Sequence, residues 1–280
     1  MTVRQIVWAW LAALLIAAAA VVAVRMVAPP ERPFFDRAQI AVVGSSLMRG
    51  AVSPFGPDAR SPQKSLLGDG RPHARIGMIA AEEWQLIAMA NQAVARKVSV
   101  LFIEVNPLIR DLPAVDDEHL CDMRQAGLRH WLKFAQFRIA NDFHSGLGLK
   151  RIERRGDEDP EQLFDAQKIT PEDIKRMYPQ QLHDPYCRQD LDAMMRNARD
   201  NGVQVVMVLP PHSRAAEAVQ SRAVVTGLRT RAGALAARYS VPLFAPQGPW
   251  DNAEFYDLAH MNIKGRAHFQ AELAAWWRSR

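Results

Sequence analysis

Residues 39–50 read Gln-Ile-Ala-Val-Val-Gly-Ser-Ser-Leu-Met-Arg-Gly, and this stretch indicates the class of fold. The apolar run of residues 40–43 stops at Gly44-Ser45-Ser46, which is typical of a buried strand that enters a tight turn. Gly44 lets the backbone bend there without a Cβ clash. Ligands and catalytic groups gather at the carboxyl ends of strands in open α/β sheets, so this turn is a candidate site. A serine that merely caps the following helix would give the same pattern.

A second motif lies near the C-terminus, where residues 255–265 read Phe-Tyr-Asp-Leu-Ala-His-Met-Asn-Ile-Lys-Gly. Asp257 precedes His260 by three residues, so its carboxylate can hydrogen-bond the imidazole and leave the other ring nitrogen for a hydroxyl. A serine hydroxyl is a poor nucleophile until such a base takes its proton. The two motifs together therefore predict a Ser-His-Asp site.

This combination resembles the SGNH/GDSL hydrolase superfamily. In that pattern residues 44–46 fall on Gly-Asp-Ser, which makes Ser46 the nucleophile, while Asp257 and His260 fall on the Asp-x-x-His pair. The resemblance implies a three-layer α/β/α domain with a mainly parallel sheet over residues 38–280. The alternation of strands and helices along the chain independently favours a parallel sheet that is covered on both faces.

The resemblance also implies an oxyanion hole. The family has a glycine in a turn before a helix and an asparagine after a strand, and Gly77 and Asn106 occupy those places. Their amide groups, with the N–H of Ser46, would bind the oxyanion of the tetrahedral intermediate. Asn106 precedes a proline, so a turn residue is the alternative interpretation. Possible substrate-binding residues are Ser45, His212 and Asn262, although His212 could simply be a loop histidine.

The remaining elements follow from apolar periodicity and from turn residues. We expect a long loop over residues 53–72 and a long insertion over about 107–190. The predicted helices cover about 78–95, 190–201 and 215–239, and a last helix follows Asn262; the predicted strands cover 98–105, 203–209 and 241–244. Within the insertion, residues 128–139 keep helical spacing, which favours an amphipathic helix packed on the domain over a membrane- or partner-facing surface.

The N-terminus carries no charge from residue 6 to residue 24, a length that predicts a helix able to span a bilayer. We expect an anchor over residues 1–28, a proline-rich linker over residues 29–37 and a cytoplasmic N-terminus. The chain would then lie in the inner membrane as a single-pass protein with a periplasmic domain. A cleaved signal peptide is the alternative.

Composition limits which partners and cofactors we expect this chain to bind. The net charge of +5 comes without a basic block interleaved with aromatics, so nucleic acid is not expected as a partner. No ligand spacing predicts a metal site, and no cofactor is expected. Cys121 and Cys187 are isolated in sequence, and could form one disulfide in an oxidising compartment or remain two buried thiols.

The chain also departs from the family pattern. Ser45 replaces the usual Asp, and residues 104–107, Glu-Val-Asn-Pro, replace Gly-x-Asn-Asp. With the anchor and the insertion, these departures resemble the membrane-anchored SGNH proteins that assist acylation of envelope polymers, as in alginate and cellulose acetylation and teichoic acid D-alanylation. That resemblance implies a membrane-bound O-acyltransferase as partner and an O-acyltransferase that acts on an envelope or exported polysaccharide through an acyl-serine. The alternatives are a carbohydrate O-acetylesterase and an inactive anchor or binding module.

Overall fold

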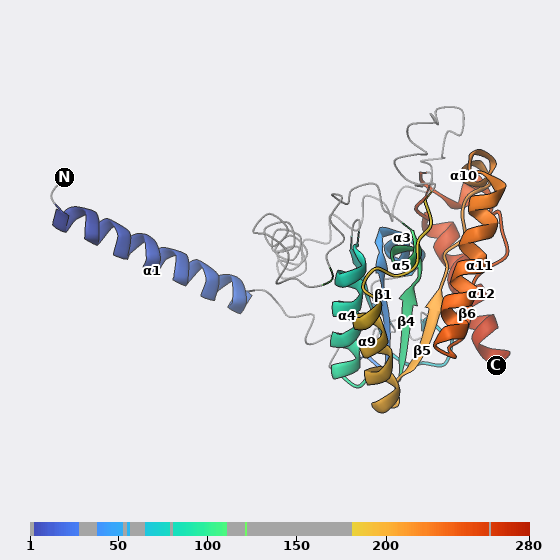
Figure 1. The fold of residues 1–280 in the computed structure, drawn as a ribbon, viewed down its shortest axis with the longest axis horizontal. Helices are drawn as coiled ribbons and strands as arrows, with labels where there is room; N and C mark the ends of the chain where they lie inside the picture. Colours follow the sequence, from blue (N-terminus) through green and yellow to red (C-terminus); the bar gives the residue numbers. More distant parts are fainter. Residues whose placement is uncertain are drawn as a thin grey trace. The chain divides into compact units, whose positions relative to one another are not determined.

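The computed structural model describes residues 3–27, 38–52, 55–56, 65–78, 81–110, 121, 181–257 and 259–280. The N-terminal helix and the α/β domain belong to separate compact units (Figure 1). The linker predicted over residues 29–37 and the helix predicted over residues 128–139 lie outside the described residues.

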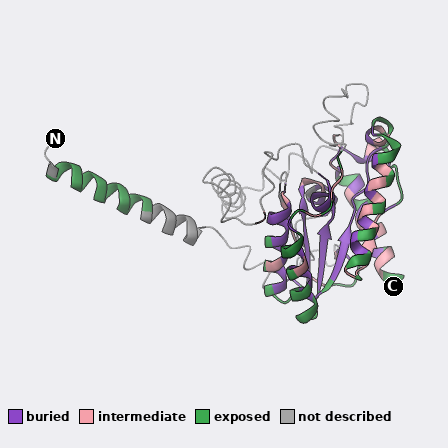
Figure 2. Ribbon diagram, in the orientation of Figure 1, coloured by how far each residue is buried: buried purple, intermediate pink, exposed green. Residues whose placement is uncertain are grey.

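The N-terminal helix α1 covers Val3–Val27, and its described side chains are exposed (Figure 2). Within the described residues, no helix combines the length and the apolar character needed to cross a membrane. The anchor predicted over residues 1–28 stays a prediction.

The domain is built on a sheet of six strands in the order β2-β3-β1-β4-β5-β6. Five of them run parallel, and β2 alone pairs antiparallel, with β3. The predicted α/β fold with a mainly parallel sheet is confirmed. The strands are β1 Ile40–Ser45, β2 Phe55–Gly56, β3 His73–Met78, β4 Val100–Glu104, β5 Gln204–Val208 and β6 Leu243–Phe244.

Helices cover both faces of the sheet, because alternate side chains of a buried strand point to opposite faces. Ile40 and Val42 of β1 join a core with Phe269 and Leu273 of α12, whereas α4 packs on β1 and β4, and α9 packs on α4 and β5. Figure 2 shows the sheet buried between exposed outer helix faces. The helices of the domain are α3 Ser46–Ala51, α4 Glu83–Ala95, α5 Asn106–Ile109, α9 Arg188–Asp200, α10 Arg214–Val219, α11 Arg222–Arg238, η3 Asn252–Glu254 and α12 Ile263–Arg278.

The strand order reverses between β1 and β4. From β1 the chain passes to β3 on one side, and then returns to β4 on the other side. Ligands bind at such a switch point, outside the carboxyl ends of the two strands. Ser45 ends β1 and Glu104 ends β4, so the topology places both residues at this edge.

The structure corrects three predictions about elements. The stretch 53–72 is not wholly loop, since β2 lies within it, and β3 was not predicted because His-Ala-Arg-Ile-Gly-Met lacks a continuous apolar run. Gly77 therefore lies in β3, opposite Gly44, and not in a turn before a helix. The helix predicted over residues 215–239 is two helices, because the Ser221 hydroxyl accepts from the N–H of Val224 at 3.2 Å and starts α11 anew.

Candidate active site

Two adjacent serines at the end of β1 have different surroundings. Ser45 is buried, and its Oγ accepts from Leu47 N at 3.1 Å, which caps α3. The same hydroxyl donates to Glu104 Oε1 at 3.0 Å. Ser46 is the first residue of α3 and is partly exposed. The Ser45 hydroxyl is thus occupied by structural contacts, and Ser46 is the one of the two that reaches solvent.

Asp257 and His260 form the hydrogen bond that their spacing predicts. Asp257 Oδ2 lies 2.7 Å from His260 Nδ1, and Asp257 Oδ1 accepts from the backbone N–H groups of His260 and Ala259 at 2.6 and 2.8 Å. Burial acts to raise the pKa of Asp257, but the hydrogen bonds and charge of His260 outweigh it and the pKa lies below its usual value. An ionised Asp257 accepts from Nδ1–H, and this assignment leaves the lone pair on Nε2.

Asn262 lies at the end of the segment that carries Asp257 and His260. It caps α12, with its Oδ1 accepting from the N–H groups of Lys264 and Gly265 at 2.9 and 3.1 Å. Its Nδ2 donates to the carbonyl groups of Ala253 and Phe255 at 2.8 and 3.3 Å. Asn262 is buried, and these contacts occupy both ends of its amide, so its position gives no support to the predicted substrate contact.

The segment with His260 packs directly on α3, the helix that begins at Ser46. Arg266 Nε donates to the carbonyl of Gly50 at 2.9 Å, and a Cβ on Gly50 would lie 3.0 Å from Met261 N. The imidazole of His260 also stacks on the ring of Tyr256, with centroids 5.5 Å apart. The tertiary structure therefore brings together two motifs that are more than two hundred residues apart in sequence.

Glu104 connects the ends of β1 and β4. Its Oε2 accepts from Ser45 N at 2.6 Å, and its Oε1 accepts from Ser45 Oγ and from Asn106 Nδ2 at 3.0 and 3.1 Å. Burial raises the pKa of Glu104 above its usual value, and the hydrogen bonds from Ser45 and Asn106 and the charge of His260 offset this only in part.

The buried Asn106, predicted to contribute to an oxyanion hole, uses one N–H of its amide on Glu104. Its Oδ1 has no hydrogen-bond partner among the described residues. An amide nitrogen carries two N–H groups, so one remains for a ligand.

His212 lies in the interior of the domain. It is buried, and its Nδ1 is 3.4 Å from Gln220 Nε2. Burial lowers its pKa to about 3, and the charges of Arg110 and Arg229 contribute. The neutral, enclosed ring gives no support to the predicted substrate contact.

Cys121 and Cys187 are joined by a disulfide, with Cα atoms 5.0 Å apart. Beside it, Glu83 accepts from the N–H groups of Tyr186 and Cys187 at 2.9 and 3.1 Å. Burial raises the pKa of Glu83 to about 7, and the charge of Asp190 acts in the same direction. These hydrogen bonds hold the start of α9 against α4.

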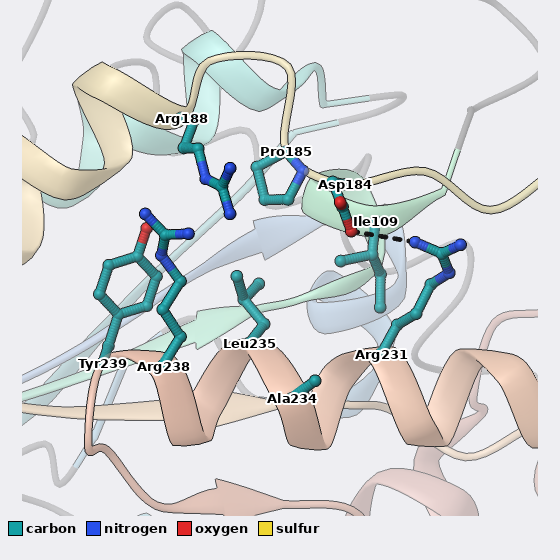
Figure 3. A pocket seen from close by; sticks show the side chains of 9 residues that line it. All are labelled: Ile109, Asp184, Pro185, Arg188, Arg231, Ala234, Leu235, Arg238 and Tyr239. Carbon is teal, nitrogen blue, oxygen red and sulfur yellow. Dashed lines mark hydrogen bonds and ion pairs between the residues drawn. The ribbon is translucent and has the colours of Figure 1, made fainter.

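A pocket of about 130 Å³ lies between α11 and the segment that precedes α9 (Figure 3). Two of its guanidinium groups have carboxylate partners, since Arg231 lies 3.0 Å from Asp184 and Arg238 lies 3.2 Å from Asp192. None of the predicted site residues lines it, so it is separate from Ser46 and His260. Its lining residues are Ile109, Asp184, Pro185, Arg188, Arg231, Ala234, Leu235, Arg238 and Tyr239.

Two residues of the site were not assigned from the sequence. Glu104 could have been predicted as a site residue from the sequence, because it ends a buried apolar strand. A carboxyl group there is costly to bury without a partner, so a specific contact is expected. Tyr256 gave no such signal, since an aromatic residue beside Asp257 has no distinctive spacing. Among the described residues, no group of three or more His, Cys, Asp or Glu is arranged to hold a metal ion.

Comparison with known proteins finds no matching family profile and no matching curated protein. Among solved structures, the chain is similar to a GDSL-like lipase from Bacteroides thetaiotaomicron, at 10% identity over 90% of this chain and 91% of that chain, with a TM-score of 0.41. It is also similar to a putative acylhydrolase from Bacteroides fragilis, at 10% identity over 86% of each chain, with a TM-score of 0.43.

Proposed function

We propose that the chain is a serine-dependent O-acyltransferase that acts on a cell-envelope or exported polysaccharide through an acyl group on Ser46. The observation that carries this proposal is the Asp257–His260 hydrogen bond in a segment that packs on α3, the helix that Ser46 begins. The proposal places the domain in the periplasm, anchored by residues 1–28, beside a membrane-bound O-acyltransferase.

In the first half-reaction, Nε2 of His260 takes the Ser46 hydroxyl proton while Oγ attacks the carbonyl carbon of an acyl donor. The amide of Asn106 and the N–H group of Ser46 are the proposed donors to the oxyanion, whereas Gly77 lies within β3 and is not counted among them. When the intermediate collapses, the bond to the leaving oxygen breaks, that oxygen takes the proton from His260, and the acyl group stays on Ser46.

In the second half-reaction, a sugar hydroxyl gives its proton to His260 and attacks the acyl-serine. Ser46 Oγ leaves and recovers the proton, so the enzyme returns to its starting state. Water in place of the sugar gives hydrolysis by the same steps, which makes an O-acetylesterase the alternative. The resemblance to envelope acylation proteins favours transfer.

The test compares the two neighbouring serines in the full-length protein, with a small acetyl ester as substrate. Ser46→Ala should lower turnover by at least about 10³-fold, because the serine and its base act as a unit. Ser45→Ala removes a helix cap and one hydrogen bond to the buried Glu104, but it leaves the nucleophile in place, so it should keep far more turnover than Ser46→Ala. A serine-directed phosphonate should label Ser46; modification of Ser45, or an active preparation that resists the reagent, would refute the assignment.

A second measurement separates transfer from hydrolysis. The protein is supplied with an acetyl donor and a short oligosaccharide, and the products are identified by mass spectrometry. An acetylated oligosaccharide supports the transferase, whereas free acetate alone identifies an esterase. Oligosaccharide binding with no turnover and no labelling identifies an inactive binding module.

A further inference from the structure

The Glu104 carboxyl group is an unusual component of the core. It is fully buried at the carboxyl end of β4, and three donors satisfy it: Ser45 N–H, Ser45 O–H and Asn106 N–H. A buried carboxyl is costly unless such hydrogen bonds are made. In each of these three hydrogen bonds the Glu104 carboxyl group is the acceptor, and the donors come from the two strand ends that border the site.

The accepting oxygen of Glu104 determines which way the neighbouring Asn106 amide faces. An asparagine can present either its oxygen or its NH2 to a partner, and the choice follows from the hydrogen bonds available. Because Glu104 Oε1 accepts, Asn106 must turn its NH2 toward it, at 3.1 Å. The second N–H of the same nitrogen then has a fixed direction, while Oδ1 makes no hydrogen bond among the described residues.

We infer that Glu104 is a positioning residue that holds the Asn106 amide with its N–H toward the oxyanion and its oxygen away. This inference rests on the proposed function, since it assigns a task to Glu104 in the same acyl transfer. It also explains why a carboxylate and Asn106 stand two residues apart at the end of one strand. Glu104 acts through Asn106 and needs no contact with substrate.

Glu104→Gln tests this with little change of shape. The buried Ser45 N–H requires an acceptor, so the amide oxygen of the new side chain takes the place of Oε2 and its NH2 faces Asn106. Asn106 then turns its Oδ1 toward that NH2, and the oxyanion loses a donor. Loss of one such donor lowers kcat by about 10²–10³-fold, so we expect a fall of about 10²-fold with KM nearly unchanged.

Combination with Asn106→Ala separates positioning from general damage. If Glu104 acts through Asn106, adding Glu104→Gln to Asn106→Ala should lower kcat no further. Glu83→Gln is the matched control, because Glu83 is also a buried glutamate that accepts backbone N–H groups, and it should leave kcat unchanged. A kcat that falls by the same factor with and without Asn106, or that stays at the wild-type value in Glu104→Gln, would overturn the inference.

Urea unfolding of the wild type, Glu104→Gln, Asn106→Ala and the double variant gives a readout that does not depend on activity. The two substitutions should be coupled in the unfolding midpoint, since both change the hydrogen bond between residues 104 and 106; independent effects would also overturn the inference. If the wild-type protein neither turns over esters nor is labelled at Ser46, the proposed function fails, and the inference falls with it. Coupled midpoints would then show that the contact itself is intact and that the function is at fault.

Discussion

Gly265 lies in the first turn of α12, where this helix meets η3 beside the segment that carries His260. A Cβ at Gly265 would contact the carbonyl oxygen of Glu254 closely, and would lie 3.1 Å from the carbonyl carbon and the Cβ of Glu254. That carbonyl also accepts from Asn262 N at 3.0 Å, so it is already fixed. Gly265→Ala therefore forces backbone to move, because no flexible side chain can give way.

The size of the effect follows from opposing contributions. Alanine is better than glycine in a helix by about 0.5–1 kcal/mol. Overpacking costs about 1–3 kcal/mol, and a disturbed Asn262 cap costs about 1 kcal/mol. We expect a net loss of about 2 kcal/mol, which lowers Tm by roughly 4–8 °C in a domain of this size. Ester turnover should also fall, because the His260 segment shifts relative to α3.

Gly233 supplies the matched control. It lies inside α11, and a Cβ there would meet nothing within 4 Å. Gly233→Ala should therefore raise stability by about 0.5–1 kcal/mol and leave turnover unchanged. The assay is thermal unfolding followed by circular dichroism, with the ester assay on the same samples. A Gly265→Ala protein as stable as wild type, or stabilised like Gly233→Ala, would refute the reasoning.

Two further predictions concern pH and topology. Burial raises the pKa of Glu83 from 4.5 to about 7, so its contribution to stability is full below pH 4.5 and is lost as pH rises through about 7. The free energy of unfolding of the wild type should fall by up to about 3 kcal/mol over that interval, whereas that of Glu83→Gln should not. Urea midpoints that change equally in the two proteins between about pH 5 and about pH 8 would contradict this. A reporter fused to the C-terminus should be active only outside the cytoplasm, and a cytoplasmic signal would refute the proposed topology.

Short-range patterns in the sequence determined part of the fold and part of the candidate site. The run of residues 40–43 and the small residues after it set a buried strand and its turn, since burial and backbone freedom act over a few residues. The contact between Asp257 and His260 was likewise predictable, because a spacing of three residues suffices to bring the two side chains within 2.7 Å. These features need no knowledge of distant segments.

Tertiary structure decided the rest. Ser45 and Ser46 are identical in type, but Glu104, fifty-nine residues away, gives the Ser45 hydroxyl a buried partner, whereas Ser46 is partly exposed. The burial of His212 and the inward-directed amide of Asn262 depend in the same way on partners from other elements. β3 was missed because its pairing with β1, and not its own apolarity, makes it a strand. Which residues become such partners depends on how the elements pack, and short-range spacing carries no information about that packing.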